Sequence, residues 1–220
     1  MDYTFTADQL AIRETIRELV QDKVVPRAAE IDQKMEYPKD IERLFAENGI
    51  LGIPFPEEYG GVSGLSVSIC MGVEEIARGD ATCSLLLAVQ ALGIGQAAFN
   101  EALAYTRERE QFGQPVAAFQ GVGWMLADMA TRLEASRRLV YHAADLCSRG
   151  LPFTREASMA KVFTTDTAMA VATDAIQLAG GYGYVEDYPF ERFFRDAKAC
   201  QIYEGSNQVQ RIVIAREILR

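Results

Sequence analysis

Three short segments in the second half of the sequence place glycine beside charged or aromatic residues at the ends of predicted helices. They cover residues 109–113 (REQFG), 177–184 (QLAGGYGY) and 203–208 (YEGSNQ). In the first, an arginine side chain and an approachable glycine backbone could bind an anion, or the segment is simply a helix C-terminus. In the second, the glycines could cradle a pyrophosphate or could stop the preceding helix; the predicted strand that a dinucleotide-binding fingerprint requires before them is missing.

The third segment contains a carboxylate, Glu204, just before the predicted start of the last helix. The N-terminus of a helix favours a negative charge. In apolar surroundings Glu204 could therefore act as a general base. The plainer interpretation is a favourable charge in the first turn of the helix.

The charge balance argues against a nucleic-acid partner. The 220 residues include 22 Lys and Arg against 31 Asp and Glu, a formal net charge of -9, without the basic excess that phosphate binding demands. The N-terminus lacks a basic and apolar leader, which predicts a cytoplasmic protein. One histidine and four widely spaced cysteines make no recognisable metal site, and we expect buried, reduced thiols; the cysteines are Cys70, Cys83, Cys147 and Cys200.

Apolar residues recur at helical spacing along nearly the whole chain, and no β-hairpin signal is found. Predicted helices cover residues 6–25, 28–32, 38–48, 66–79, 80–109, 116–149, 154–180, 190–197 and 206–219, with a loop over 50–64. Thr6 with Gln9 fits a capping box, and Thr154 fits a helix N-cap. The sequence predicts an all-α protein in which three long helices and the C-terminal helix make a four-helix bundle.

Residues 81–100 carry no charged side chain. A run of this length could cross a membrane or form a helix that is buried on most sides. We favour the buried helix and expect no membrane span, because several polar side chains interrupt the run and no Lys/Arg cluster flanks it.

The order and spacing of the three segments resemble the acyl-CoA dehydrogenase family. The resemblance rests on R-x-Q-F-G from Arg109, Q-x-x-G-G-x-G from Gln177, R-D-A from Arg195 and Y-E-G from Tyr203. Shorter matches lie at residues 31–32, 52–54, 56–61, 74–77, 119–120, 126–129 and 160–161. Together these motifs cover nearly the whole chain.

The resemblance implies FAD as cofactor and acyl-CoA thioesters of fatty acid metabolism, of the short- or medium-chain type, as substrates. In this family a glutamate of the Tyr-Glu-Gly motif removes the proton α to the thioester carbonyl while the β-hydrogen leaves as hydride to the flavin, and Glu204 matches that glutamate. Arg109, Gln111, Phe112, Gln177 and Gly181 match residues that contact the FAD of a neighbouring subunit, and Ser206 and Gln208 match further FAD contacts, with Ser206 in place of the usual threonine. No residue of the resemblance implies a metal.

The family's middle β-domain has no counterpart in this sequence. The resemblance implies an N-terminal helical domain (residues 1–88) packed on a C-terminal helical bundle domain (89–220), with a seam near 86–90; Ala81 and Ser84 replace an Asp and an Arg that commonly contact acyl-CoA. Because the β-domain holds the flavin ring in the family, we expect a catalytically impaired deletion, engineered or natural. The alternative is a working dehydrogenase with residual FAD and acyl-CoA binding. Either form is expected to be a homo-oligomer assembled through the C-terminal bundle.

Overall fold

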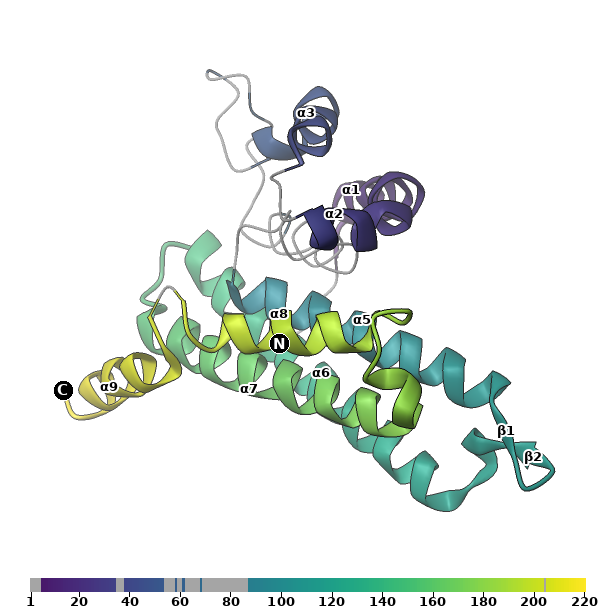
Figure 1. Cartoon of the computed structure of the whole chain (residues 1–220). Helices are drawn as coiled ribbons and strands as arrows, with labels where there is room; N and C mark the ends of the chain where they lie inside the picture. The colour runs from purple at the N-terminus through teal and green to yellow at the C-terminus, as the bar shows by residue number, and fades with distance from the viewer. Residues whose placement is uncertain are drawn as a thin grey trace.

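A bundle of helices forms the body of the molecule (Figure 1). The structure is a computed structural model, and it describes residues 5–34, 38–53, 58, 61, 68, 87–203 and 205–220. The bundle consists of α5 (Leu87–Glu108), α6 (Gln120–Ser148), α7 (Thr154–Ala179) and α8 (Phe190–Cys200). A short hairpin of β1 (Glu110–Gln111) and β2 (Gln114–Pro115) lies at one end, and α9 (Asn207–Ile218) lies at the other. The predicted all-α helical bundle is confirmed.

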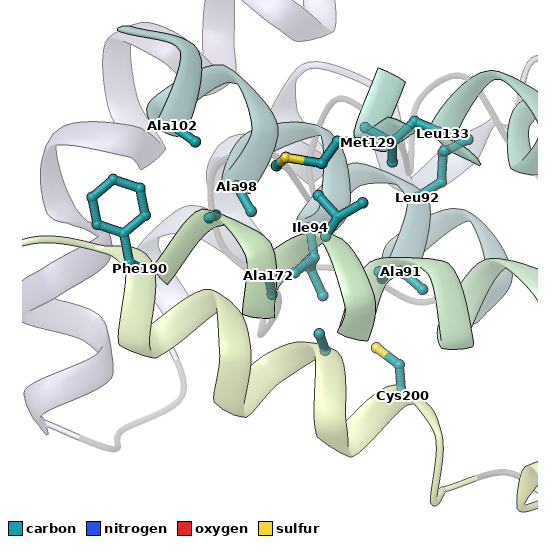
Figure 2. Packing of buried hydrophobic residues seen from close by; sticks show 14 of the residues in the cluster. Ala91, Leu92, Ile94, Ala98, Ala102, Met129, Leu133, Ala172, Phe190 and Cys200 are labelled. Atoms are coloured by element: carbon teal, nitrogen blue, oxygen red, sulfur yellow. The ribbon is translucent and has the colours of Figure 1, made fainter. Parts of the chain in front are cut away.

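Small side chains allow the helices of the bundle to pack closely. The core combines a few large residues with many alanines (Figure 2): Ala91, Leu92, Ile94, Ala98, Ala102, Met129, Leu133, Ala168, Val171, Ala172, Ala175, Ala179, Phe190, Ala197 and Cys200. At Gly95 of α5, an added Cβ would lie 3.0 Å from Leu133 Cδ2 and 3.3 Å from the Ala168 Cα. The contact between α5 and α7 therefore depends on residues with little or no side chain.

The fourth helix of the bundle is α8. The C-terminal helix, α9, was expected in this position from the sequence, and that expectation was wrong. α8 contributes Phe190, Ala197 and Cys200 to the core. By contrast, Asn207 is the buried residue of α9, and Val209 and Ile212 on that helix are 48% and 69% exposed. α8 has a strongly one-sided apolar face, whereas the apolar residues of α9 are spread around the helix.

The uncharged run is a core helix over the part that the structure describes. Within α5, residues 89–95 are all buried, including the polar Gln90. None of the described helices is long and apolar enough to span a membrane.

The N-terminal helices pack on one another around a core of their own. They are α1 (Ala7–Leu19), a π-helical turn (Val20–Val24), a 3₁₀ turn (Val25–Arg27), α2 (Ala28–Lys34), α3 (Lys39–Glu47) and a second 3₁₀ turn (Ile50–Gly52). The capping box of α1 is confirmed, because Gln9 N–H donates to Thr6 Oγ1 and Thr6 N–H donates to Gln9 Oε1. The predicted helix over 66–79 and the start of the one over 80–109 fall outside the described residues, apart from Ser68, so the domain boundary at 88/89 stays a prediction.

Three local expectations were wrong. Glu110 pairs with Pro115 and Gln111 with Gln114 in an antiparallel hairpin, although no hairpin signal is present. Phe153 occupies the N-cap of α7, so Thr154 is the first helical residue. Cys147 is exposed near the end of α6, whereas Cys200 is a buried free thiol as expected; Cys70 and Cys83 lie outside the described residues.

Candidate functional site

The tip of the hairpin exposes an aromatic residue. Phe112 and Gly113 form the turn with positive φ angles of 53° and 79°, which is the pattern of a type I′ turn. The Phe112 side chain is 92% exposed and meets only the ring of Phe119 among the described aromatic residues, edge-on at 6.1 Å between centroids. Gln111 beside it is also exposed. The hairpin therefore directs two of the predicted cofactor contacts away from the bundle.

Arg109 is fixed at the base of this hairpin. Its N–H donates to the Tyr105 carbonyl and its own carbonyl accepts from Val116 N–H, both at 2.8 Å. The Arg109 guanidinium carbon lies 5.6 Å from the centroid of the Tyr182 ring, within the range of a cation–π contact. No carboxylate of the described residues pairs with this guanidinium, so its forked N–H donors are available to an anion.

The Tyr182 ring is itself held in a cluster of aromatic residues. Its centroid lies 5.5 Å from that of Tyr188 and 6.4 Å from that of Tyr105. Tyr105 and Tyr188 also pack on the fully buried Phe190. Burial raises the pKa of Tyr105, and the nearby Arg109 charge opposes that rise. The cluster packs the C-terminal part of α5, the turn after α7 and the start of α8 against one another.

The three glycines that follow α7 differ in whether, and why, the structure requires a glycine at each position. Gly180 ends the helix with φ 62°, a conformation that favours glycine. At Gly183 an added Cβ would lie 2.7 Å from the Ile176 carbonyl oxygen, so packing requires a glycine there. At Gly181 neither reason applies, because the space around a Cβ is open. Gly181, which directly precedes Tyr182, is therefore exposed and unobstructed, and Gln177 four positions earlier is exposed as well.

At the other end of the bundle, one carboxylate holds both ends of the connection between α8 and α9. Asp166 Oδ1 accepts from Gln201 Nε2 at 2.6 Å and from Asn207 Nδ2 at 2.7 Å, and its Oδ2 accepts from Arg211 at 2.9 Å. The Asn207 N–H also donates to the Gln201 carbonyl at 3.1 Å. Glu204 lies in this connection but falls outside the described residues.

A buried lysine lies beneath the same connection. Lys161, 6% exposed, donates to Asn207 Oδ1 at 2.7 Å. Asn207 Nδ2 donates to Thr165 Oγ1 at 2.9 Å, and that hydroxyl donates to the Lys161 carbonyl at 2.9 Å. Burial lowers the pKa of Lys161, and burial likewise raises the pKa of the Cys200 thiol nearby. The start of α9 is thus attached to α7 by a compact polar network.

The residues on either side of Glu204 are also anchored. The Tyr203 hydroxyl donates to Gln90 Oε1 at 2.6 Å, which ties the connection to α5. Gly205 has φ 90°, and a side chain there would be strained. Ser206 is the N-cap of α9 and is half-buried, whereas Gln208 is exposed in its first turn.

The structure divides the predicted site residues between the C-terminal end and the middle of α7. Arg109 lies over Tyr182 just beyond the C-terminus of α7, where Gln177 and Gly181 also lie in the chain, and Gln111 and Phe112 follow Arg109 in the hairpin. By contrast, Ser206 and Gln208 flank Asn207, which bonds to Thr165 in the middle of α7. Gln177 lies twelve positions after Thr165 in the helix, a rise of about 18 Å. One chain therefore presents two separate groups of predicted contacts.

The local sequence indicates no role for Tyr182 or Asp166, and Lys161 stands out only as part of the short match at residues 160–161. Their contacts join residues far apart in the chain, which local spacing cannot show. The one available signal is a lysine at a position that helical periodicity places on one face with the buried Ser158, Thr164 and Thr165.

Comparison with known proteins gives a consistent result over the whole chain. The profile described as acyl-CoA dehydrogenase, C-terminal domain, matches residues 84–219, and the profile of the N-terminal domain of the same family matches residues 6–119. An acyl-CoA dehydrogenase of Bacillus subtilis is 58% identical over 133 residues, which is 60% of this chain and 35% of that protein. A short-chain specific acyl-CoA dehydrogenase of Clostridium acetobutylicum is 54% identical over 134 residues, which is 61% of this chain and 35% of that protein.

Solved structures agree in fold. The butyryl-CoA dehydrogenase of Megasphaera elsdenii superposes with a TM-score of 0.95 at 25% identity, and the match covers 100% of both chains. A chain from a study of the electron transferring flavoprotein of Acidaminococcus fermentans gives 0.96 at 27% identity, also over 100% of both. The chain spans about a third of the length of the curated relatives that it matches.

Proposed function

This chain belongs to the acyl-CoA dehydrogenase family, and from that premise we propose that it binds FAD and carries the base of an acyl-CoA α,β-desaturation, with impaired catalysis of its own. The observation that carries the proposal is the Arg109 guanidinium, which lies over the ring of Tyr182 and has no carboxylate partner among the described residues; Gly181, directly before Tyr182, has open space around it. These residues suit the diphosphate of a dinucleotide cofactor, because arginine and accessible backbone amides both donate to phosphate oxygens.

The two groups of predicted contacts have separate tasks in this proposal. Arg109, Gln111, Phe112, Gln177 and Gly181 bind the FAD of a neighbouring copy, and Ser206 and Gln208 bind the cofactor beside their own chain's Glu204. The separation of about 18 Å along α7 supports this division. FAD, when bound, supplies the acceptor for the hydrogen that leaves the substrate's β-carbon.

In the proposed reaction, Glu204 takes the proton α to the thioester carbonyl. The connection that contains it is held at both ends by Asp166 and at Tyr203 by Gln90. Such anchoring lowers the cost of placing a base within hydrogen-bonding reach of its proton. Acyl-CoA binding is weakened in the proposal, since Ala81 and Ser84, which lie outside the described residues, replace the residues that usually contact it.

In this proposal, catalysis is impaired because the chain lacks a β-domain to hold the flavin ring. The β-structure of the described residues is the hairpin of β1 and β2, whereas the family holds the flavin ring against a β-domain. A ring without that support loses its fixed distance to the substrate, and poor positioning costs orders of magnitude in rate.

We also propose that the chain forms a homo-oligomer. Between α6, α7 and α9 lies an open, mainly apolar groove; its apolar lining is Leu139, Met159, Val162, Phe163, Ala170 and Ile214, and Arg132, Asp166, Thr167 and Arg211 complete the lining. Phe163 is 40% exposed although it lies in the middle of a bundle helix, and a second copy would remove this surface from water. Light scattering at several concentrations tests the assembly.

A flavin titration tests the proposal as a whole. FAD fluorescence and absorbance are followed as the purified chain is added, first alone and then with a short acyl-CoA. Saturable binding that R109Q weakens by about tenfold or more supports the cofactor site, since the change removes a charged hydrogen-bond donor. R138Q removes the same charge from an exposed ion pair on α6 and should leave FAD affinity unchanged.

The second arm separates binding from catalysis. FAD binding without bleaching of the oxidised flavin band by acyl-CoA supports the impaired form. Bleaching that Glu204→Gln abolishes would favour the alternative, a working dehydrogenase. A folded, monodisperse sample that binds no FAD at tens of micromolar would refute the cofactor proposal.

A further inference from the structure

Tyr182 is placed where it controls the orientation of Arg109. The guanidinium carbon of Arg109 lies 5.6 Å from the Tyr182 ring centroid. Arginine is a long side chain with many rotamers, and an exposed one is disordered unless something holds it. In the described part of the chain, the ring of Tyr182 is the group that Arg109's guanidinium contacts.

The ring can hold the guanidinium because it is itself held. The centroid of Tyr188 lies 5.5 Å from that of Tyr182, with 64° between the ring planes, and the centroid of Tyr105 lies 6.4 Å away. Although Tyr182 is 47% exposed, both neighbours pack on the buried Phe190. The orientation of the ring is therefore set by the core of the bundle.

A contact through the face of the ring has a chemical advantage over an ion pair. The electrons of the ring face stabilise the positive charge and leave unused the N–H donors, which point outward from the edge of the planar guanidinium. A carboxylate in the same place would use those donors and would repel an anionic ligand. The backbone of Arg109 is fixed as well, through Tyr105 and Val116, so the donors are oriented before a ligand arrives.

We propose that Tyr182 is a positioning residue, whose ring orients the Arg109 guanidinium so that its free edge receives the diphosphate of the cofactor. This inference rests on the proposed FAD binding. It assigns Tyr182 no contact with the cofactor itself, and it predicts that FAD affinity depends on the aromatic ring of Tyr182 and not on its hydroxyl group.

The test compares FAD affinities of Y182L and Y182F with that of the unaltered chain. Y182L should weaken binding about three- to tenfold, the combined effect of a lost cation–π contact and a less ordered arginine. Y182F keeps the ring and should stay within about twofold. F153L, which removes a partly exposed aromatic residue at the other end of α7, is the control and should bind as the unaltered chain does.

A double-mutant cycle shows whether Tyr182 acts through Arg109. In the R109Q background, Y182L should produce no further loss of FAD affinity, whereas a general loosening of the fold would weaken both backgrounds equally. Circular dichroism of each variant confirms that it is folded. The inference is overturned if Y182L binds FAD as tightly as the unaltered chain, if Y182F is as weak as Y182L, or if Y182L weakens R109Q further.

The outcomes also separate this inference from the function on which it rests. If R109Q weakens FAD binding and Y182L does not, only the role of Tyr182 is refuted. If the unaltered chain fails to bind FAD, or if R109Q has no effect on it, the proposed cofactor site is refuted and the role of Tyr182 is refuted with it.

Discussion

Phe112 has a backbone conformation that is unfavourable for its residue type. Its φ of 53° costs a bulky L-residue about 1–2 kcal/mol, and its side chain is almost fully exposed. Neither local geometry nor burial explains a phenylalanine here, since Asn-Gly is the preferred pair for such a turn. A strained, exposed aromatic residue is typical of a binding role.

F112N should therefore separate stability from binding. We expect the free energy of unfolding in urea to stay unchanged or to rise by up to about 1 kcal/mol, because asparagine accepts this conformation. FAD affinity should fall at the same time. A loss of stability without a change in FAD affinity would show that Phe112 supports the hairpin through Phe119 instead.

Lys161 makes the stability of the chain depend on pH. Burial lowers its pKa in the folded state below 10.5, whereas the unfolded chain keeps the ordinary value. Below the lowered pKa the lysine is charged in both states and the full cost of burial is present. Between the two values the unfolded state binds more protons, so stability rises with pH.

K161M removes this titration. The free energy of unfolding of the unaltered chain should rise relative to that of K161M as pH increases toward 10.5. Urea unfolding of both proteins from pH 7 to pH 10 measures the difference. Cys200, whose raised pKa gives the opposite slope above 9.0 and is itself lowered by the Lys161 charge, makes the comparison cleanest below pH 9. Parallel curves would mean that Lys161 titrates normally in the folded chain.

At the scale of elements, the turn after α7 offers a matched pair of glycines. G183A should lower the free energy of unfolding by about 1–3 kcal/mol, because its Cβ would overlap the Ile176 carbonyl oxygen at 2.7 Å. G181A meets open space and should keep stability within about 0.5 kcal/mol. FAD affinity should respond to G181A, since the methyl group occupies the surface where the cofactor approaches. Thermal unfolding and FAD titration of the two variants check both statements, and equal destabilisation would contradict this assignment.

The positions of the helices follow from local signals, and most could be predicted. Gly49, Gly150 and Gly180 end α3, α6 and α7 with positive φ angles, as their place after apolar helical runs indicates. The hairpin could not be predicted, because phenylalanine is not a residue that signals a type I′ turn.

The candidate site was predictable only in part, for a physical reason. Arg109 and Gly181 have unusual local sequences, but the partner that orients Arg109 is Tyr182, 73 positions away. The network at Asp166 likewise joins three elements. Contacts of this kind are decided by how helices pack, which the spacing of residues along one helix does not contain.

At the scale of the whole molecule, the N-terminal helices and the bundle have separate cores. Among the described residues, Phe5 contacts both parts: its ring meets Tyr141 of α6 edge-on with 5.4 Å between the centroids, and the guanidinium carbon of Arg13 of α1 lies 5.8 Å from the centroid of the Phe5 ring. Phe5 immediately precedes the capping box of α1.

F5A should therefore loosen the N-terminal helices without changing the bundle. An aromatic pair contributes about 0.5–1.5 kcal/mol beyond its buried area, so we expect the N-terminal helices to melt at a lower temperature while the main transition stays in place. Calorimetry, or hydrogen exchange of residues 7–34 against 87–179, resolves the two. A single transition that shifts as a whole would show that the two cores unfold together.

The small residues along α7 also determine which substitutions this helix tolerates on its buried face. Its buried face includes Ser158, Ala160, Thr164, Thr165, Ala168, Ala172 and Ala175, and Gly95 faces Ala168 across the helix pair. Such positions have little side chain to lose, so truncation leaves almost no cavity, whereas one added methyl group must displace a neighbouring backbone. Mutational tolerance here is one-sided: an upper limit on side-chain volume, more than a demand for hydrophobicity, restrains the buried face of the helix where Gly95 meets Ala168.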